Sequence, residues 1–244
     1  MENTSLIALS RQGVLRRQMN IVANNIANMN TTGFKGEKMM FVQHLVRSRG
    51  GENILGERIA FVRDVATMRD VSEGPLLSTG NPLDIAVRDD GYLVVETEQG
   101  NRYTRNGHLR LDDTGQLVTG QGDKLLSTGD QSFFFSSEDK QINIARDGTV
   151  STENGELGKL KVVRFENQQQ LRQIGGGLFA TEQQPEEVEK PDIVQGMLEG
   201  SNVNAIIEMT RMIETQRAYA SIGNFIKSED DRIKTMIKEL AAPV

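Results

Sequence analysis

The sequence of 244 residues contains no cysteine and no tryptophan, and only 5% of its residues are aromatic. Without cysteine, the chain can form no disulfide, thiolate nucleophile, iron–sulfur cluster or cysteine-bound zinc site. It also has no apolar run near the roughly 20 residues that a membrane-spanning helix needs. Basic residues number 28 against 34 acidic ones, a formal net charge of −6, and this excludes a general nucleic-acid-binding role.

The amino-terminal residues lack the pattern of a cleavable secretion signal. Residues 1–5 are polar, and the apolar stretch at residues 6–9 is too short before Arg11. We therefore expect either a cytosolic protein or one exported by a route that reads no cleavable signal. Composition does not distinguish between the two.

An N-terminal helix is predicted over residues 3–30, which contain no proline and end shortly before Gly33, a residue type that often terminates helices. Apolar residues recur there at intervals of seven, as in Ile7, Val14 and Ile21. This spacing produces an apolar stripe suited to packing along another helix.

A stronger helical pattern covers residues 202–240, with Ser201 or Asn202 as the expected cap. Gly223 either kinks this helix or permits a close approach. The alternative is an ordinary core helix, but the heptad spacing is sustained over Met212, Tyr219, Ile226, Ile233 and Leu240.

Between these helices the chain changes to short β segments separated by turn residues. Asn–Gly and Asp–Gly pairs, such as Asn106-Gly107, are typical of antiparallel hairpins because these residues accept positive φ. The fold class we predict is mixed α and β, with long N- and C-terminal helices that pair as a coiled-coil-like element around a central all-β domain. The expected divisions are an N-terminal helix and turn at 1–34, an extended connector at 35–80, the β domain at 81–182, a return linker at 183–200, and the C-terminal helix at 201–244.

The sequence contains no recognisable catalytic chemistry. The two histidines, His44 and His108, lie in different regions, and no P-loop, dinucleotide fingerprint, nucleophile elbow or metalloprotease motif is present. Two acidic pairs, at residues 89–90 and 112–113, lack the ligand spacing of a calcium loop and are explained as hairpin turns. We expect no enzyme activity, no cofactor and no metal site.

Asparagine is unusually dense at the end of the first helix, with four in residues 24–30. Asparagine is a poor helix former because its amide competes for nearby backbone groups. Asn24 and Asn28 are four residues apart and share one face of the helix. We predict that their amides bond across a helix–helix contact and fix its register, the alternative being a frayed helix end.

Three blocks of the sequence resemble those of bacterial flagellar rod and hook proteins. Residues 23–35 are similar to the N-terminal signature of that family. Residues 80–87 and 103–107 resemble the start of its β domain. Residues 198–204, 208–209 and 216–219 resemble its C-terminal helix. The blocks occur in the family's order and span nearly the whole chain.

The resemblance implies a structural subunit of the rod, the drive shaft between the motor base and the hook, located in the periplasm-spanning part of the basal body. Such subunits leave the cell through the flagellar type III export apparatus and stack helically with copies of themselves and with other rod proteins. Their terminal helices line the inner tube, and their β domain faces outwards. The short connector before Asn81 and the chain ending at 241–244 favour a proximal-rod member over a distal-rod one.

A non-flagellar alternative is a binding module that dimerises through a simple coiled coil, which sedimentation would distinguish from a rod subunit. On the rod hypothesis, the residues expected at subunit contacts come from both terminal blocks and from the C-terminal heptads. They are Asn24, Asn25, Ile26, Asn28, Gly33, Phe34, Ser201, Asn202, Val203, Met209, Met212, Gln216, Tyr219, Ile226 and Ile233.

Overall fold

The computed structural model describes residues 2–48, 57–136, 139 and 141–241. The end of the chain after residue 241, part of the ending that favoured a proximal-rod member, lies outside this range. The chain divides into two compact units, each described by itself. The helical unit holds the two long helices and a two-stranded ribbon. The β unit holds Asn28–Gly36 and Arg69–Val203.

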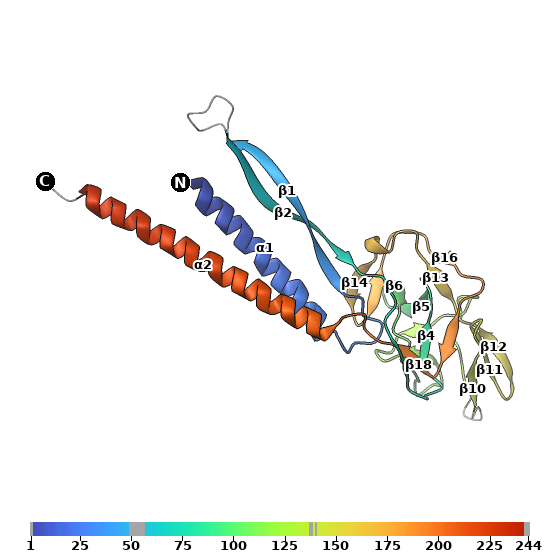
Figure 1. Ribbon diagram of the computed structural model, residues 1–244. Helices are drawn as coiled ribbons and strands as arrows, with labels where there is room; N and C mark the ends of the chain where they lie inside the picture. The colour runs from blue at the N-terminus through green and yellow to red at the C-terminus, as the bar shows by residue number, and fades with distance from the viewer. Residues whose placement is uncertain (1, 49–56, 137–138, 140, 242–244) are drawn as a thin grey trace. The chain divides into compact units, whose positions relative to one another are not determined.

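Both predicted helices are present, as α1 (Glu2–Ala27) and α2 (Ala205–Ala241). They lie side by side in the helical unit (Figure 1). The cap of α2 is Asn204 rather than Ser201 or Asn202, because the Asn204 side chain accepts hydrogen bonds from the backbone amides of Ile206 and Ile207, at 3.1 and 3.3 Å. α2 continues through Gly223 as one helix.

The first helix ends three residues earlier than the pattern predicted. A turn follows Ala27, in which the Thr31 amide donates to the Asn28 carbonyl at 3.1 Å. The Thr31 hydroxyl also donates to the Asn28 side chain at 3.2 Å. Asn28 therefore bonds locally at a turn, and this competes with continuation of the helix.

The segment expected as an extended connector pairs with itself over most of its length. Its strands β1 (Glu37–Ser48) and β2 (Glu57–Arg69) form the two-stranded ribbon of the helical unit, with the last residue of β2 counted in the β unit. Both segments contain valine and phenylalanine, and the second also contains isoleucine, residue types that favour strands.

The β unit is built on one nine-stranded sheet. Its main path is β14-β15-β6-β5-β9-β8-β7, and β13 pairs with both β5 and β16. The bounds are β5 (Tyr92–Thr97), β6 (Gly100–Thr104), β7 (Leu109–Leu111), β8 (Leu117–Thr119), β9 (Lys124–Leu125), β13 (Val162–Arg164), β14 (Arg172–Gly175), β15 (Leu178–Ala180) and β16 (Glu186–Glu187), with a 3-10 turn at Gln168–Gln170.

Three smaller sheets complete the unit. They are β10 (Ile142–Ile144) with β11 (Thr149–Thr152) and β12 (Gly155–Lys159), β4 (Ile85–Val87) with β17 (Ile193–Gln195), and β3 (Leu76–Ser78) with β18 (Met197–Glu199). The segment at 183–200, expected as a return linker, thus contributes β16, β17 and β18. Pro185 directly precedes β16 and Pro191 lies between β16 and β17, so both lie outside the strands, where they remove no ladder hydrogen bond.

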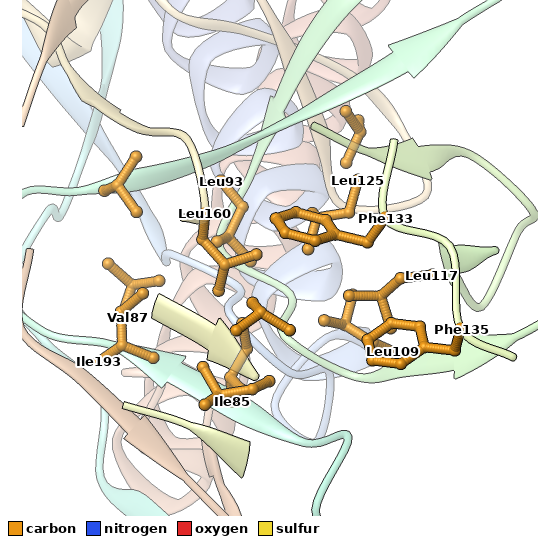
Figure 2. Close-up of a cluster of buried hydrophobic side chains, with 14 of the residues drawn as sticks. Ile85, Val87, Leu93, Leu109, Leu117, Leu125, Phe133, Phe135, Leu160 and Ile193 are labelled. Carbon is orange, nitrogen blue, oxygen red and sulfur yellow. The ribbon is translucent and has the colours of Figure 1, made fainter. Parts of the chain in front are cut away.

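Strand β5 is buried on both faces, which explains its continuous apolar sequence. Leu93 and Val95 belong to one buried cluster (Figure 2), and Tyr92 and Val94 belong to a second on the opposite face. In the second cluster the Tyr103 and Phe165 rings meet edge to face, 4.7 Å apart.

Two of the predicted hairpin turns are present, and one glycine pair has another role. Gly115, with φ of +82°, lies in the turn between β7 and β8, and Gly100, with φ of +95°, is the first residue of β6 directly after the turn that follows β5. Asn106-Gly107 is not such a turn. A Cβ on Gly107 would lie 1.7 Å from the carbonyl oxygen of Ile85, whose amide donates to the Gly107 carbonyl at 3.0 Å. Glycine is required there because two backbone segments touch.

We predict that Gly107→Ala destabilises the β unit by about 1–3 kcal/mol, since the new methyl group forces the two segments apart. Gly120→Ala is the matched control, because a Cβ there meets nothing within 4 Å. Its effect should stay within about 0.5 kcal/mol. Urea unfolding followed by near-ultraviolet circular dichroism, to which the buried Tyr92 and Tyr103 contribute, measures both. Equal midpoints for the two variants would contradict the close contact.

Candidate functional site

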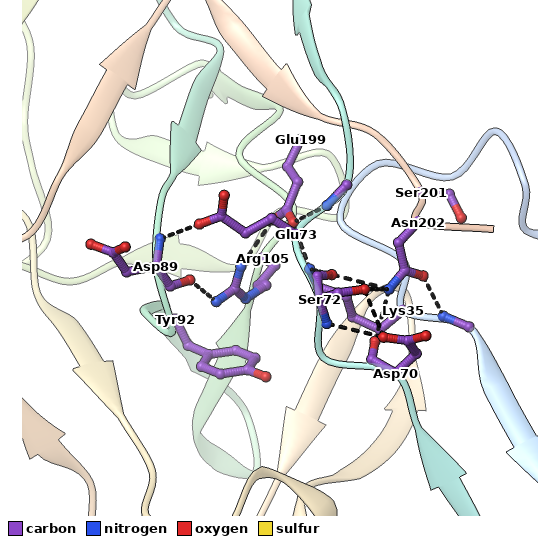
Figure 3. A network of polar contacts seen from close by, with 12 residues as sticks. Lys35, Asp70, Ser72, Glu73, Asp89, Tyr92, Arg105, Glu199, Ser201 and Asn202 are labelled. Atoms are coloured by element: carbon purple, nitrogen blue, oxygen red, sulfur yellow. Dashed lines mark hydrogen bonds and ion pairs between the residues drawn. The ribbon is translucent and has the colours of Figure 1, made fainter. Parts of the chain in front are cut away.

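Three segments distant in sequence are joined by backbone hydrogen bonds in the β unit, and Figure 3 shows the polar side chains that lie among them. They are residues 33–36, 70–75 and 199–202. The Gly33 amide donates to the Glu199 carbonyl, the Asp70 amide to the Gly36 carbonyl and the Gly200 amide to the Pro75 carbonyl, each at 2.8 Å. We call these segments, with Arg105, the polar joint.

A buried charge cluster lies at the centre of the polar joint. The Lys35 ammonium is 2.6 Å from Oε1 of Glu199, and Nη1 of Arg105 is 3.2 Å from Oε2. All three side chains are at most 2% exposed. Such groups are tolerated inside a protein only when charges and hydrogen bonds compensate the loss of water.

Further hydrogen bonds add to this compensation, although Nε of Arg105 is buried without a hydrogen-bond partner among the described residues. Lys35 also donates to the Ser72 carbonyl at 2.7 Å, and the Gly74 amide donates to Oε1 of Glu199 at 3.0 Å. Arg105 donates to the Asp89 carbonyl, and its guanidinium lies 5.0 Å from the centre of the Tyr92 ring. Burial lowers the pKa of Lys35, and the nearby Arg105 lowers it further, against the opposing effect of Glu199.

Asn202 ties the same segments together through one amide. Its Oδ1 accepts from the Gly36 amide at 2.8 Å, and its Nδ2 donates to the carbonyls of Asp70 and Ser72 at 2.8 and 3.0 Å. This position needs an acceptor and a two-hydrogen donor in one planar group, which an aspartate does not provide.

Gly33 fits the polar joint for two reasons. Its φ is +68°, and a Cβ would lie 2.7 Å from the carbonyl carbon of Arg105. A similar constraint applies at Gly74, where a Cβ would lie 1.9 Å from the Gly200 oxygen.

A second buried polar contact lies within the helical unit, centred on Asn25, which is 3% exposed. Its Oδ1 accepts from the Glu37 amide at 2.9 Å, and its Nδ2 donates to the Glu37 carbonyl at 2.8 Å and to Oε2 of Glu208 at 3.1 Å. Glu208 is itself 5% exposed and pairs with Arg211. This helix–ribbon contact joins α1, β1 and α2.

The asparagine that crosses between helices inside the chain is therefore Asn25. Asn24 is exposed and Asn28 is half-buried at the turn after α1. The contacts expected of Asn24 and Asn28 with neighbouring helices stay a prediction, whereas the contact within the chain is made by Asn25. The apolar stripe of α1 contains several adjacent lines, and spacing alone does not say which of them turns inward.

The other residues expected at subunit contacts differ in burial. Gly33, Phe34 and Ser201 are buried in the β unit. Met209 and Gln216 are exposed on α2. The half-buried residues are Ile26, Asn202, Val203, Met212, Tyr219, Ile226 and Ile233.

Lys35, Arg105, Glu199 and Glu208 were not among the expected site residues, although these four lie inside the three sequence blocks. The signal available was an isolated charge within a run of apolar and glycine residues, as at Lys35 in Gly33–Gly36 and at Glu199 in residues 198–200. A charge in such a run is a candidate for burial with a partner of opposite sign.

The rest of the described chain offers little other chemistry. Its His, Asp and Glu side chains form no group of three or more that could hold a metal ion. In the same residues, no helix combines the length and apolar character needed to cross a membrane.

Models of three protein families match the chain. They are described as flagella basal body rod protein at residues 6–35, flagellar hook protein FlgE/F/G D1 domain at 86–152, and flagellar basal body rod FlgEFG protein C-terminal at 194–239. The polar joint and the helix–ribbon contact both draw residues from the first and the last of these matches.

Individual relatives are similar over nearly their whole length. The chain is 34% identical to the flagellar basal-body rod protein FlgF of Caulobacter vibrioides, covering 98% of each protein. It is 32% identical to the rod protein FlgG of Buchnera aphidicola from Acyrthosiphon pisum, over 93% of this chain and 96% of that one. It is 30% identical to FlgG of Bacillus subtilis, over 90% and 92%.

We predict that Asn25→Ala loosens the helix–ribbon contact, because it leaves the Glu37 amide and the Glu208 carboxylate without this partner. An unpaired buried group costs about 1–3 kcal/mol, so the Glu37 amide should exchange its hydrogen roughly 5- to 150-fold faster. Asn20→Ala, at an exposed position of α1, is the control and should leave that rate unchanged. Hydrogen exchange of the purified chain measures both. Unchanged exchange in Asn25→Ala would show that the contact does not hold the ribbon.

A pH dependence follows from the lowered pKa of Lys35. The folded chain binds fewer protons at Lys35 than the unfolded chain does, so the free energy of unfolding should rise as the pH approaches the ordinary lysine value of 10.5 from below. Lys35→Met should lack this rise. Burial also raises the pKa of Tyr92, but any effect of Tyr92 on the free energy of unfolding is shared by the wild type and Lys35→Met. Urea unfolding at several pH values from about 7 to 9.5 is the measurement. Parallel curves for the two proteins would refute it.

Proposed function

Because the chain belongs to the flagellar basal-body rod protein family, it is a structural subunit of the rod in the bacterial flagellar basal body, and we propose that it assembles there through its terminal helices. The family is structural, and we propose no enzymatic role for this member. Its partners are copies of itself and the other rod proteins. The flagellar type III apparatus exports it.

An exposed apolar strip on α2 is the observation that supports assembly through the helices. Ile206, Met209 and Ile213 are 74%, 48% and 51% exposed, and their spacing of three and four places them on one face. Scattered apolar residues on a surface are common, but a contiguous row of large ones is typical of a surface that another protein covers. We call these three residues the outer strip.

The predicted heptad line has a different role in this proposal. Met212, Tyr219, Ile226 and Ile233 are half-buried in the chain, whereas the outer strip is exposed. α1 lies beside α2 and buries Val14 and Val22. We infer that the heptad line pairs the two helices of one subunit in a coiled-coil-like seam, and that the outer strip meets neighbouring subunits. Met209 and Gln216 then remain candidate contact residues between subunits.

Within the family, we propose a proximal-rod subunit of the FlgF type. The identity to FlgF of C. vibrioides is 34%, against 32% and 30% to the two FlgG proteins. The subunit would pass torque from the motor base towards the hook. The buried polar joint suits that task. It fixes residues 33–36 and 199–202 on the β unit by several hydrogen bonds and ion pairs, in addition to the covalent backbone.

The assembly proposal predicts that Met209→Asp combined with Ile213→Asp abolishes swimming. Charges on the outer strip cannot be buried against an apolar neighbour without a large cost. The β unit, which contains neither residue, should unfold at an unchanged urea concentration. The variant is expressed in a cell that lacks its own copy, and hook–basal bodies are counted by electron microscopy.

Ser221→Asp with Ser228→Asp is the matched control, because it places two charges on exposed positions of another face of α2. This variant should form normal numbers of hook–basal bodies. Normal swimming by the outer-strip variant would mean that the strip stays in solvent, and would refute assembly through this face.

A further inference from the structure

The polar joint contains two buried cations but a single buried anion. Glu199 uses one carboxylate oxygen for Lys35 and the other for Arg105, and among the residues that the structure describes neither cation pairs with a second carboxylate. The middle segment also contains two acidic residues that are not fully buried: Glu73 is exposed and accepts a hydrogen bond from the Asp89 amide, and Asp70 is half-buried and accepts from the amide and hydroxyl of Ser72. The two cations therefore share their only buried countercharge (Figure 3).

These three charges arrive from widely separated parts of the chain. Lys35 comes before the ribbon, Arg105 follows β6, and Glu199 ends β18, shortly before α2. The segments that carry Lys35 and Glu199 also bond through their backbones: the Gly33 amide donates to the Glu199 carbonyl at 2.8 Å and the Asn202 amide to the Phe34 carbonyl at 3.4 Å. The N-terminal segment thus rests partly on the C-terminal one.

We propose that the polar joint is a charge interlock, in which residues 33–36 can dock on the β unit only together with residues 199–202. Before Glu199 is in place, docking would bury two cations with no countercharge, and such burial is strongly unfavourable. Once Glu199 is in place, both segments are held. Residues 33–36 and residues 199–202 therefore become ordered on the β unit in one cooperative step. This inference concerns the chain alone and does not rest on its role in the rod.

The competing explanation is that the segments are held by shape and backbone bonding, with the charges incidental. The two explanations predict opposite signs for the effect of Lys35→Met on the stability of a chain that already carries Glu199→Gln. Under the interlock, Lys35→Met is mild because Arg105 and Glu199 remain as a balanced pair, whereas Glu199→Gln is severe because both cations lose their partner. In the Glu199→Gln background, Lys35→Met should then be beneficial, because it removes one uncompensated cation.

Hydrogen exchange of the full chain, read by mass spectrometry, tests this. In Glu199→Gln, the amides of Gly33, Gly36 and Asn202 should exchange at least about tenfold faster than in the wild type, while β5 and β8 keep their protection. Lys35→Met alone should change these rates less than about threefold, because Arg105 still neutralises Glu199 and no buried charge is left uncompensated. The double variant should exchange more slowly at these amides than Glu199→Gln does.

Glu186→Gln is the matched control, since Glu186 pairs with Arg164 at the surface and both side chains are more than half exposed. It should leave the joint unchanged. The proposal is overturned if Lys35→Met is as disruptive as Glu199→Gln, or if the double variant is no better protected than Glu199→Gln. If Glu199→Gln also exposes the core strands, the comparison still decides, because the interlock requires the double variant to regain core protection.

Discussion

A charged or amide side chain removed from water is stable only where partners satisfy it, and this constraint governs how the sequence motifs of this chain are arranged. The carboxylate of Glu199 is satisfied by Lys35, Gly74 and Arg105, which come from three other segments of the β unit, and the amide of Asn25 by groups from the ribbon and from α2. Each contact therefore brings together segments that are far apart in sequence. The apolar clusters of the β unit supply bulk stability, but the polar contacts specify which segments meet.

Much of the fold could be predicted from the sequence because it depends on local periodicity. The heptads of α2 and the hairpin at Gly100 are signals of this kind, and both are present. The β1–β2 ribbon and the strand β17 were missed. Strand β17 is defined by its pairing with β4, in which Ile193 lies opposite Val87, and no local pattern of residues 193–195 reveals such a partner.

The site residues show the same distinction. Spacing identified the region of Asn24, Asn25 and Asn28, but only the fold shows that Asn25 points inward and bonds to Glu208. The charges of Lys35, Arg105 and Glu199 lie within recognisable sequence blocks, yet their mutual distances depend on three separate strands and turns. Phe34 was expected at a contact between subunits. In the structure it is buried within its own chain, where it contributes to the packing of the β unit.

The position of the two helices at opposite ends of the chain has a consequence for folding kinetics. Helical proteins usually fold fast because their contacts are local in sequence. Here the bond between Asn25 and Glu208 joins residues 183 positions apart. The loop that this contact closes contains the whole β unit. The entropic cost of closing the loop therefore falls only after the β unit has folded and shortened the flexible chain between the two residues. The helical unit of this protein should consequently form at the rate of its β unit, and its helices should be the last elements to gain stable tertiary contacts.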